Sequence, residues 1–270
     1  KKNNIINGIT DWVYEEEFAF VRAFEWSADS NKIAFLKFDE KEVPEFSMDL
    51  YGKKLYPKQH VFKYPKAGEK NAIVSLYIAD LEAMALDNVR LGDYKDFYIP
   101  RIKWTTNPDI LSVQVLNRHQ NNLDLIFVDA KTKAPKIVLN EKDEAYIDIT
   151  DNLTFLEDNS FIWTSEKDGY NHIYHYKETG ELITQVTKGN WDVTAYYGYD
   201  KKNKKVFYQS VENGSINRDI YAISLDGENK KRLSTKEGIN DAEFSKDFGF
   251  YISYFSNATT PYEYTLHKGK

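Results

Sequence analysis

The residues best suited to chemistry are three consecutive carboxylates near the start of the chain, Glu15, Glu16 and Glu17. Acidic runs of this kind are most often solvated surface, because charged side chains avoid burial. Two neighbouring carboxylates could instead meet at one ligand, but on a strand their side chains would point to opposite faces. Joint action of two adjacent glutamates of this run therefore predicts a helical turn or an irregular backbone at this point.

The sequence shows no pattern for a catalytic nucleophile or a metal site. An α/β-hydrolase needs a Gly-x-Ser-x-Gly elbow, and no such pentad occurs. None of the five histidines stands in a context typical of a general base. His172 and His175 are three positions apart, and on a strand they would point to opposite faces. We therefore expect no catalytic residue, no metal site and no cofactor in this chain.

Composition favours β-structure and argues against nucleic acid as a partner. The 270 residues include 20 Tyr and 16 Phe, which suit pleated, half-buried surfaces. A formal net charge of −6 leaves no basic surface for nonspecific nucleic-acid binding. No apolar stretch approaches the roughly 18 residues of a membrane span. The sequence has no cysteine, which excludes disulfides and thiol catalysis.

One unit recurs along the chain: an aromatic-containing strand, a short polar turn and a second apolar strand. This alternation around turns rich in Asp, Asn, Lys or Pro predicts a β-hairpin each time. Three of the four spacings between the units lie near the roughly 40–50 residues of a propeller blade. The units are anchored at Trp26, Trp104, Phe155, Tyr199 and Phe244.

Several units carry a second hairpin, so that each would make a four-stranded blade. The expected strand pairs are 122–129 with 135–139, 170–176 with 182–186, and 218–225 with 231–233. We predict an all-β fold, a β-propeller of four-stranded antiparallel blades, with about five blades in this chain. Residues 1–23 are expected to end a preceding blade. The segment 41–68 is expected to be an inserted surface loop.

The stretch Asp11–Glu17, Asp-Trp-Val-Tyr-Glu-Glu-Glu, resembles the double-glutamate signature of the dipeptidyl peptidase IV family. Other resemblances follow in the family's order and span almost the whole chain. They are Glu42-Val43-Pro44, Tyr64–Gly68, Gly169–Ile173, Thr187–Val193 and Tyr264–His267. The resemblance implies an eight-bladed propeller followed by an α/β-hydrolase domain. Residues 1–270 are then expected to be a partial propeller without the catalytic domain.

The resemblance also implies a role for the acidic run. In this family the second and third glutamates of the signature hold the free α-ammonium of a peptide, and they match Glu16 and Glu17. An ammonium offers three N–H donors and one charge, which two carboxylates meet with charge-assisted hydrogen bonds. Glu15 is expected to be structural or solvent-facing. Arg22 and Arg101 do not match the arginine with which the family orients the substrate carbonyl.

The parent protein is therefore expected to be a serine exopeptidase that removes Xaa-Pro or Xaa-Ala dipeptides, while this chain alone would be inactive. Its partners would be peptides with a free N-terminus, its own hydrolase domain and, in the full-length protein, a second copy. One alternative is an inactive family member that binds proteins through its propeller. Another is an unrelated propeller with a coincidental acidic run. The Lys-, Asn- and Tyr-rich composition favours a bacterial protein of the periplasm or cell envelope, or a secreted one.

Overall fold

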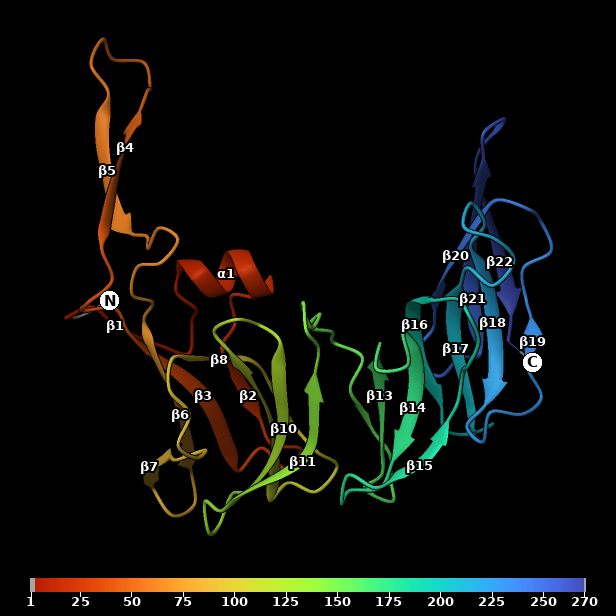
Figure 1. Cartoon of the computed structure of the whole chain (residues 1–270), viewed down its shortest axis with the longest axis horizontal. Coiled ribbons are helices and arrows are strands. Elements are labelled where there is room, and N and C mark those ends of the chain that lie inside the picture. The colour runs from red at the N-terminus through yellow and green to blue at the C-terminus, as the bar shows by residue number, and fades with distance from the viewer. Residues whose placement is uncertain (1–2, 270) are drawn as a thin grey trace. The chain divides into compact units, whose positions relative to one another are not determined.

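The structure is a computed structural model that describes residues 3–269, and its regular secondary structure is almost entirely antiparallel β-sheet (Figure 1). The chain divides into two compact units, Lys1–Ile149 and Thr150–Lys270. Each sheet joins strands that are close in sequence, as in the blades of a propeller. The predicted all-β class is confirmed. Within the described residues, the structure has no helix with the length and hydrophobicity needed to cross a bilayer.

The first unit contains two blade-like sheets. In the first sheet the strand order is β1-β3-β6-β7, with β2 also paired to β3, and in the second it is β11-β10-β9-β8. The strands of the first sheet are β1 (Ile5–Asn7), β2 (Phe24–Trp26), β3 (Lys32–Asp39), β6 (Ile73–Asp80) and β7 (Ala85–Val89). Those of the second are β8 (Phe97–Trp104), β9 (Ile110–Asn117), β10 (Asn122–Asp129) and β11 (Pro135–Lys142).

The residues before Phe24 correct one expectation, because they do not end a preceding blade. β1 and β2 both pair with β3, so they form one interrupted strand of the first sheet. The interruption closes on itself, since the Ala23 N–H donates to the Gly8 carbonyl at 3.0 Å. Between these two residues the chain loops out and carries the helix α1 (Trp12–Phe18). The excursion made one strand look like two in the sequence.

The inserted segment 41–68 also differs from expectation, because it is a β-hairpin and not a loop. Strands β4 (Glu45–Leu50) and β5 (Lys58–Lys63) pair antiparallel over their full length. At the base, the Tyr64 N–H donates to the Pro44 carbonyl at 3.0 Å. We call β4, β5 and their turn the arm (Figure 1). Most of its residues are exposed on both faces, so no hydrophobic alternation marked its strands.

The second unit contains three sheets, of four, four and three strands. They confirm the predicted second hairpins at 170–186 and 218–233, as the first unit does at 122–139. The strands are β12 (Thr154–Phe155), β13 (Phe161–Ser165), β14 (His172–Tyr176), β15 (Leu182–Gln185), β16 (Val193–Asp200), β17 (Lys205–Ser210), β18 (Asp219–Ser224), β19 (Lys231–Arg232), β20 (Ile239–Phe244), β21 (Phe250–Asn257) and β22 (Thr260–Lys268).

The core of each unit is made by side chains that alternate along the strands. On β3, Leu36 and Phe38 are fully buried, and the residues between and beside them are partly exposed. In the second unit, apolar residues of two successive sheets join one cluster that includes Ile173, Val206 and Tyr208. Burial of each such side chain contributes about 1.5–3 kcal/mol. This packing is what gives the sheets fixed positions from which loops can present functional groups.

In the first unit, an ion pair and a hydrogen bond tie the two sheets together. The Lys32 Nζ atom on β3 lies 2.9 Å from the Asp109 carboxylate, which stands in the β8–β9 turn. Lys131 approaches the other oxygen of Asp109 at 2.6 Å. The Trp104 ring N–H also donates to the Glu25 carbonyl at 3.0 Å. Hydrogen bonds from Lys131 and Lys32 hold the pKa of Asp109 below its usual range.

Asp109→Asn should lower the free energy of unfolding of the 270-residue chain near pH 7 and change it little near pH 3. A carboxylate with a depressed folded-state pKa stabilises the fold fully above its unfolded pKa of about 3.9, and loses this effect as the pH falls through the folded value. Because Asp109 is partly exposed, we expect about 1 kcal/mol at pH 7. Urea unfolding at pH 7, 5 and 3 measures it.

The control is Glu178→Gln, which removes an exposed carboxylate from a turn of the second unit. It should leave the free energy of unfolding unchanged within about 0.5 kcal/mol at every pH. A loss for Asp109→Asn that stays constant from pH 7 to pH 3 would show that the tie does not depend on the charge of Asp109.

Candidate functional site

The acidic run lies on the short helix α1, so the predicted helical turn is confirmed. The Asp11 side chain caps the helix by accepting the Tyr14 N–H at 3.0 Å, which satisfies one of the free donors of the first turn. The helix ends at Phe18, and its C-cap residue Ala19 has a left-handed φ of 54°. Caps at both ends limit α1 to seven residues, which include all three glutamates of the signature.

Two aromatic side chains fix α1 to the body of the first unit. Tyr14 and Phe18 are 2% and 4% exposed, and a spacing of four residues places them on one face of the helix. The Tyr14 hydroxyl accepts the Ile99 N–H at 2.9 Å, far along the sequence on β8. Its ring also meets those of Phe38 and Tyr98 edge-on, at centroid distances of 4.7 and 5.8 Å. Burial raises the pKa of Tyr14, which therefore remains protonated.

The anchored face determines where the three glutamates lie. A helix turns by about 100° per residue, so Glu16 lies opposite Tyr14 and Phe18, with Glu15 and Glu17 on either side. All three side chains are exposed, and none enters the interior. The structure therefore brings Glu16 and Glu17 onto the outer side of one short helix. This arrangement can present two carboxylates to a cationic ligand.

Glu17 has a partner from a distant part of the chain. The Gln120 side chain, in the turn between β9 and β10, donates from Nε2 to Glu17 Oε1 at 2.7 Å. The negative charge of Glu17 also affects the pKa of two nearby tyrosine hydroxyls. Burial raises the pKa of Tyr98 and of Tyr146, and the negative charge of Glu17 adds to both shifts. Sequence reasoning missed Gln120, because nothing in the local sequence of this turn connects it with residues 11–17.

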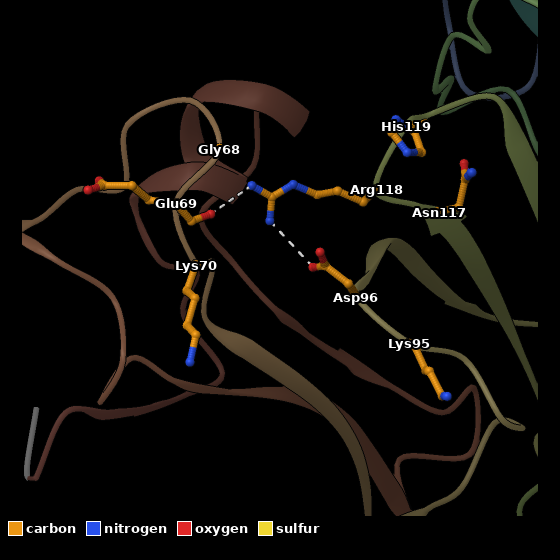
Figure 2. Close-up of a pocket in the computed structure, with 8 residues that line it drawn as sticks. All are labelled: Gly68, Glu69, Lys70, Lys95, Asp96, Asn117, Arg118 and His119. Carbon is orange, nitrogen blue, oxygen red and sulfur yellow. Dashed lines mark hydrogen bonds and ion pairs between the residues drawn. The ribbon is translucent and has the colours of Figure 1, made fainter.

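An open pocket of about 580 Å³ lies beside the same turn. Its lining residues come from three segments of the first unit and are Gly68, Glu69, Lys70, Lys95, Asp96, Asn117, Arg118 and His119 (Figure 2). Arg118 donates to the Glu69 carbonyl at 3.0 Å and lies 3.4 Å from the Asp96 carboxylate. Lys70 and Lys95 point away from Arg118 (Figure 2). The positive groups do not converge, so the pocket is not built as an anion site.

The base of the arm touches α1 directly. The Trp12 ring lies against Tyr64, which follows β5, with 4.1 Å between ring centroids. Tyr64 in turn lies 5.3 Å from the ring of Phe46 on β4. An offset or tilted aromatic pair contributes about 0.5–1.5 kcal/mol beyond its buried area. The helix that carries Glu16 and Glu17 therefore packs on the sheets of the first unit with one side and on the base of the arm with another.

Arg22 and Arg101, which do not match the family's carbonyl-orienting arginine, each have contacts within the first unit. Arg22 forms an ion pair with Glu25 at 2.6 Å, and more than half of its side chain is exposed. Arg101 lies over the Phe20 ring, 5.2 Å from its centroid, and donates to the Pro100 carbonyl at 2.8 Å. These contacts are local, an ion pair with Glu25 for Arg22 and packing on the Phe20 ring for Arg101.

The two closely spaced histidines have separate partners, as expected for residues on a strand. The His172 ring contacts the Thr187 hydroxyl at 3.1 Å and the Gly189 carbonyl at 2.9 Å. His175 instead contacts the Ser160 hydroxyl at 2.8 Å, and burial lowers its pKa. Both side chains are buried. Their hydrogen bonds join neighbouring segments of one sheet and give them structural roles.

Comparisons with known proteins agree over nearly the whole chain. A family model for the dipeptidyl peptidase IV N-terminal region matches residues 1–262. The chain is 30% identical to a probable dipeptidyl-aminopeptidase B of Phaeosphaeria nodorum over 97% of its length, and 28% identical to dipeptidyl peptidase 4 of Trichophyton equinum over 96%. It covers 32% and 36% of these two proteins, so it spans about a third of the curated relatives it matches.

Two solved structures give the same result for the fold. Porphyromonas gingivalis dipeptidyl peptidase 4 superposes on 98% of the chain with a TM-score of 0.93 and 43% sequence identity. The chain covers 38% of that structure. A putative dipeptidyl aminopeptidase IV of Bacteroides ovatus superposes on 100% of the chain with a TM-score of 0.84 and 24% identity, and the chain covers 41% of it. At that identity the second match shows a shared fold.

Tyr14→Phe should destabilise the chain although it keeps the ring. The substitution removes the hydroxyl that accepts the buried Ile99 N–H, and an unpaired buried donor costs about 1–3 kcal/mol. Urea unfolding of the 270-residue chain measures the loss. Tyr262→Phe, at a side chain that is 65% exposed, is the control and should cost little. Equal effects of the two variants would contradict the anchoring role of the Tyr14 hydroxyl.

Proposed function

Because the chain belongs to the dipeptidyl peptidase IV N-terminal region family, we propose that it is the substrate-gripping part of a dipeptidyl peptidase. The parent protein would remove Xaa-Pro or Xaa-Ala dipeptides from peptides with a free N-terminus. Its acyl-transfer step would use a serine on an α/β-hydrolase domain outside residues 1–270. The propeller would also limit which substrates reach that serine.

The observation that carries the proposal is the pair Glu16 and Glu17, exposed together on a helix that the buried Tyr14 and Phe18 hold in place. We call these two glutamates the ammonium clamp. A protonated α-amine has three donors, and two carboxylates supply charged acceptors for them. An internal peptide segment has a neutral amide at this point, so it would gain no such charge-assisted bond. The clamp therefore selects chain ends.

The clamp also explains how such an enzyme would release two residues at a time. A substrate held by its ammonium has its second peptide bond at a fixed distance from the held end. A nucleophile at that distance would meet only this bond in a reactive geometry. The propeller contributes a rigid reference point, and the hydrolase domain contributes the chemistry. Packing of α1 against the core makes that reference point stiff.

In the full-length protein, Glu16→Gln and Glu17→Gln should each lower kcat/KM about ten- to a hundredfold, since a hydrogen bond to a charged group contributes about 1.5–3 kcal/mol. Glutamine retains the shape of the side chain and removes its charge. Turnover of Gly-Pro-p-nitroanilide measures the effect. Glu15→Gln, on the same helix, is the matched control and should stay within about twofold. Equal losses for all three variants would contradict the clamp.

The arm supports a second part of the proposal, that two copies of the full-length protein associate. Several large apolar side chains of the arm are exposed, and Leu55 and Tyr56 at its turn are 88% and 80% exposed. Apolar groups gathered on one projecting element are typical of a protein contact. The same observation favours the alternative in which an inactive relative acts through protein binding. A Gly-x-Ser-x-Gly elbow in the part of the full-length protein outside residues 1–270 would favour the active enzyme over the inactive binding protein.

Leu55→Ser combined with Tyr56→Ser should shift the full-length protein from dimer towards monomer. The change removes apolar area from the arm without touching the core, so the melting temperature should hold. Light scattering after size-exclusion chromatography measures the mass across a dilution series. Met84→Ser, also 88% exposed but on the β6–β7 turn, is the matched control. A dimer that is insensitive to the arm variant would contradict this role.

The cellular setting belongs to the proposal as well. The Lys-, Asn- and Tyr-rich sequence without cysteine fits a protein of the bacterial periplasm or cell envelope, or a secreted one. The similarity to the Porphyromonas gingivalis structure supports a bacterial source, while the curated relatives named above are fungal. Fractionation of the source cells, with the full-length protein followed by antibody, tests the location.

A further inference from the structure

The contact between Gln120 and Glu17 links the ammonium clamp to a second sheet. Glu17 belongs to the excursion from the first sheet, and Gln120 stands in the β9–β10 turn of the second sheet, 103 positions later. The 2.7 Å distance from Nε2 to Oε1 is that of a good charge-assisted hydrogen bond. It engages one oxygen of Glu17 and leaves Oε2 for a ligand.

The backbone that carries Gln120 is held firmly. Its N–H donates to the Asn117 carbonyl at 2.9 Å, and its own carbonyl accepts the Ile147 N–H at 2.9 Å. The Asn117 side-chain oxygen accepts the N–H groups of Asn121 and Asn122, each at 3.0 Å. Gln120 itself has a φ of 56°, a region that suits glycine and asparagine better. The turn can therefore fix the amide in space.

The oxygen of the Gln120 side-chain amide lacks a hydrogen-bond partner among the described residues. This Oε1 atom is buried, and residues 3–269 offer it no hydrogen-bond partner. Buried acceptors are nearly always paired, so an unpaired one needs an explanation. Rotating the amide by half a turn would place Oε1 against the Glu17 carboxylate, which is also an acceptor. The contact with Glu17 thus fixes the orientation of the amide, at the cost of leaving Oε1 unpaired.

We propose that Gln120 is a positioning residue of the ammonium clamp: it holds the Glu17 carboxylate in the direction of the substrate amine without neutralising it. The inference rests on the proposed function. An amide donates a hydrogen bond but has no charge, so Glu17 keeps its full attraction for an ammonium. Arg118 stands only two residues away and could form an ion pair, but its guanidinium is engaged by Glu69 and Asp96 instead. A cation at position 120 would compete with the substrate.

The test uses the full-length protein and Gly-Pro-p-nitroanilide. Gln120→Asn retains the amide, suits the backbone and is one methylene too short to reach Glu17. We expect KM to rise about fivefold with kcat within about twofold, because substrate binding is weakened and not the chemistry. Gln120→Gly relieves the backbone and should raise KM similarly without lowering the melting temperature. Gln120→Lys should raise KM most, because it neutralises Glu17.

A matched control is Gln185→Asn in the second unit, where the amide also donates to a carboxylate, that of Asp168, at 2.5 Å. KM should not change in this variant. Glu17→Gln and the double variant Glu17→Gln/Gln120→Asn complete a cycle in which Gln120→Asn should have no further effect once Glu17 has lost its charge.

The outcomes separate the two proposals. No effect of Glu17→Gln on KM would overturn the ammonium clamp itself, and with it the role of Gln120. A large effect of Glu17→Gln with none from Gln120→Asn would overturn only the role of Gln120. Additive effects in the double variant, or KM changes that follow a falling melting temperature in all three Gln120 variants, would overturn it too, because Gln120 would then act on the fold and not through Glu17.

Discussion

Burial of the Tyr14 side chain is the constraint on which the candidate site depends. A helix of seven residues is too short to be stable alone, because its few hydrogen bonds do not offset the free energy of helix nucleation. Tyr14 stabilises the helix from outside it. Its ring is buried in the core of the first unit, and its hydroxyl accepts a hydrogen bond from the Ile99 N–H of β8. Since the buried face is fixed, the orientation of the remaining side chains follows from the helical repeat, and the acidic run must face outward.

The exposure of Glu16 and Glu17 resolves an electrostatic conflict. Two neighbouring carboxylates repel each other, and burying them together without a cation would cost far more than the helix could repay. On the solvent side water screens both charges, and the site can remain empty without unfolding the turn. A bound ammonium would then replace water with a matched charge. The helix is therefore anchored by the buried Tyr14 and Phe18 on one face and by the contact of Trp12 with Tyr64, while Glu16 and Glu17 remain exposed.

The sequence predicts the fold well where the signals are local. Anchors such as Trp104 and Tyr199 stand in the first strands of their sheets, because a hairpin depends on a turn and on the alternation beside it. The helical turn at Glu16 and Glu17 followed from one geometric requirement. The arm escaped prediction because its strands have no buried face, and β1 was misassigned because an excursion separates it from β2. Gln120 could not be found, since only the folded chain brings it to Glu17.

Helix α1 contacts three neighbouring parts of the first unit. Tyr14 anchors α1 to the sheets of the first unit, and Trp12 packs against Tyr64 at the base of the arm. Glu17 accepts a hydrogen bond from the side-chain amide of Gln120. A shift of the arm would move Trp12, and a shift of the β9–β10 turn would move Gln120, so both displacements would converge on the same seven residues. Because the helix is short, it cannot absorb them by bending. Its rigidity is therefore set by its partners, and the direction of the two carboxylates depends on contacts that lie outside the acidic signature.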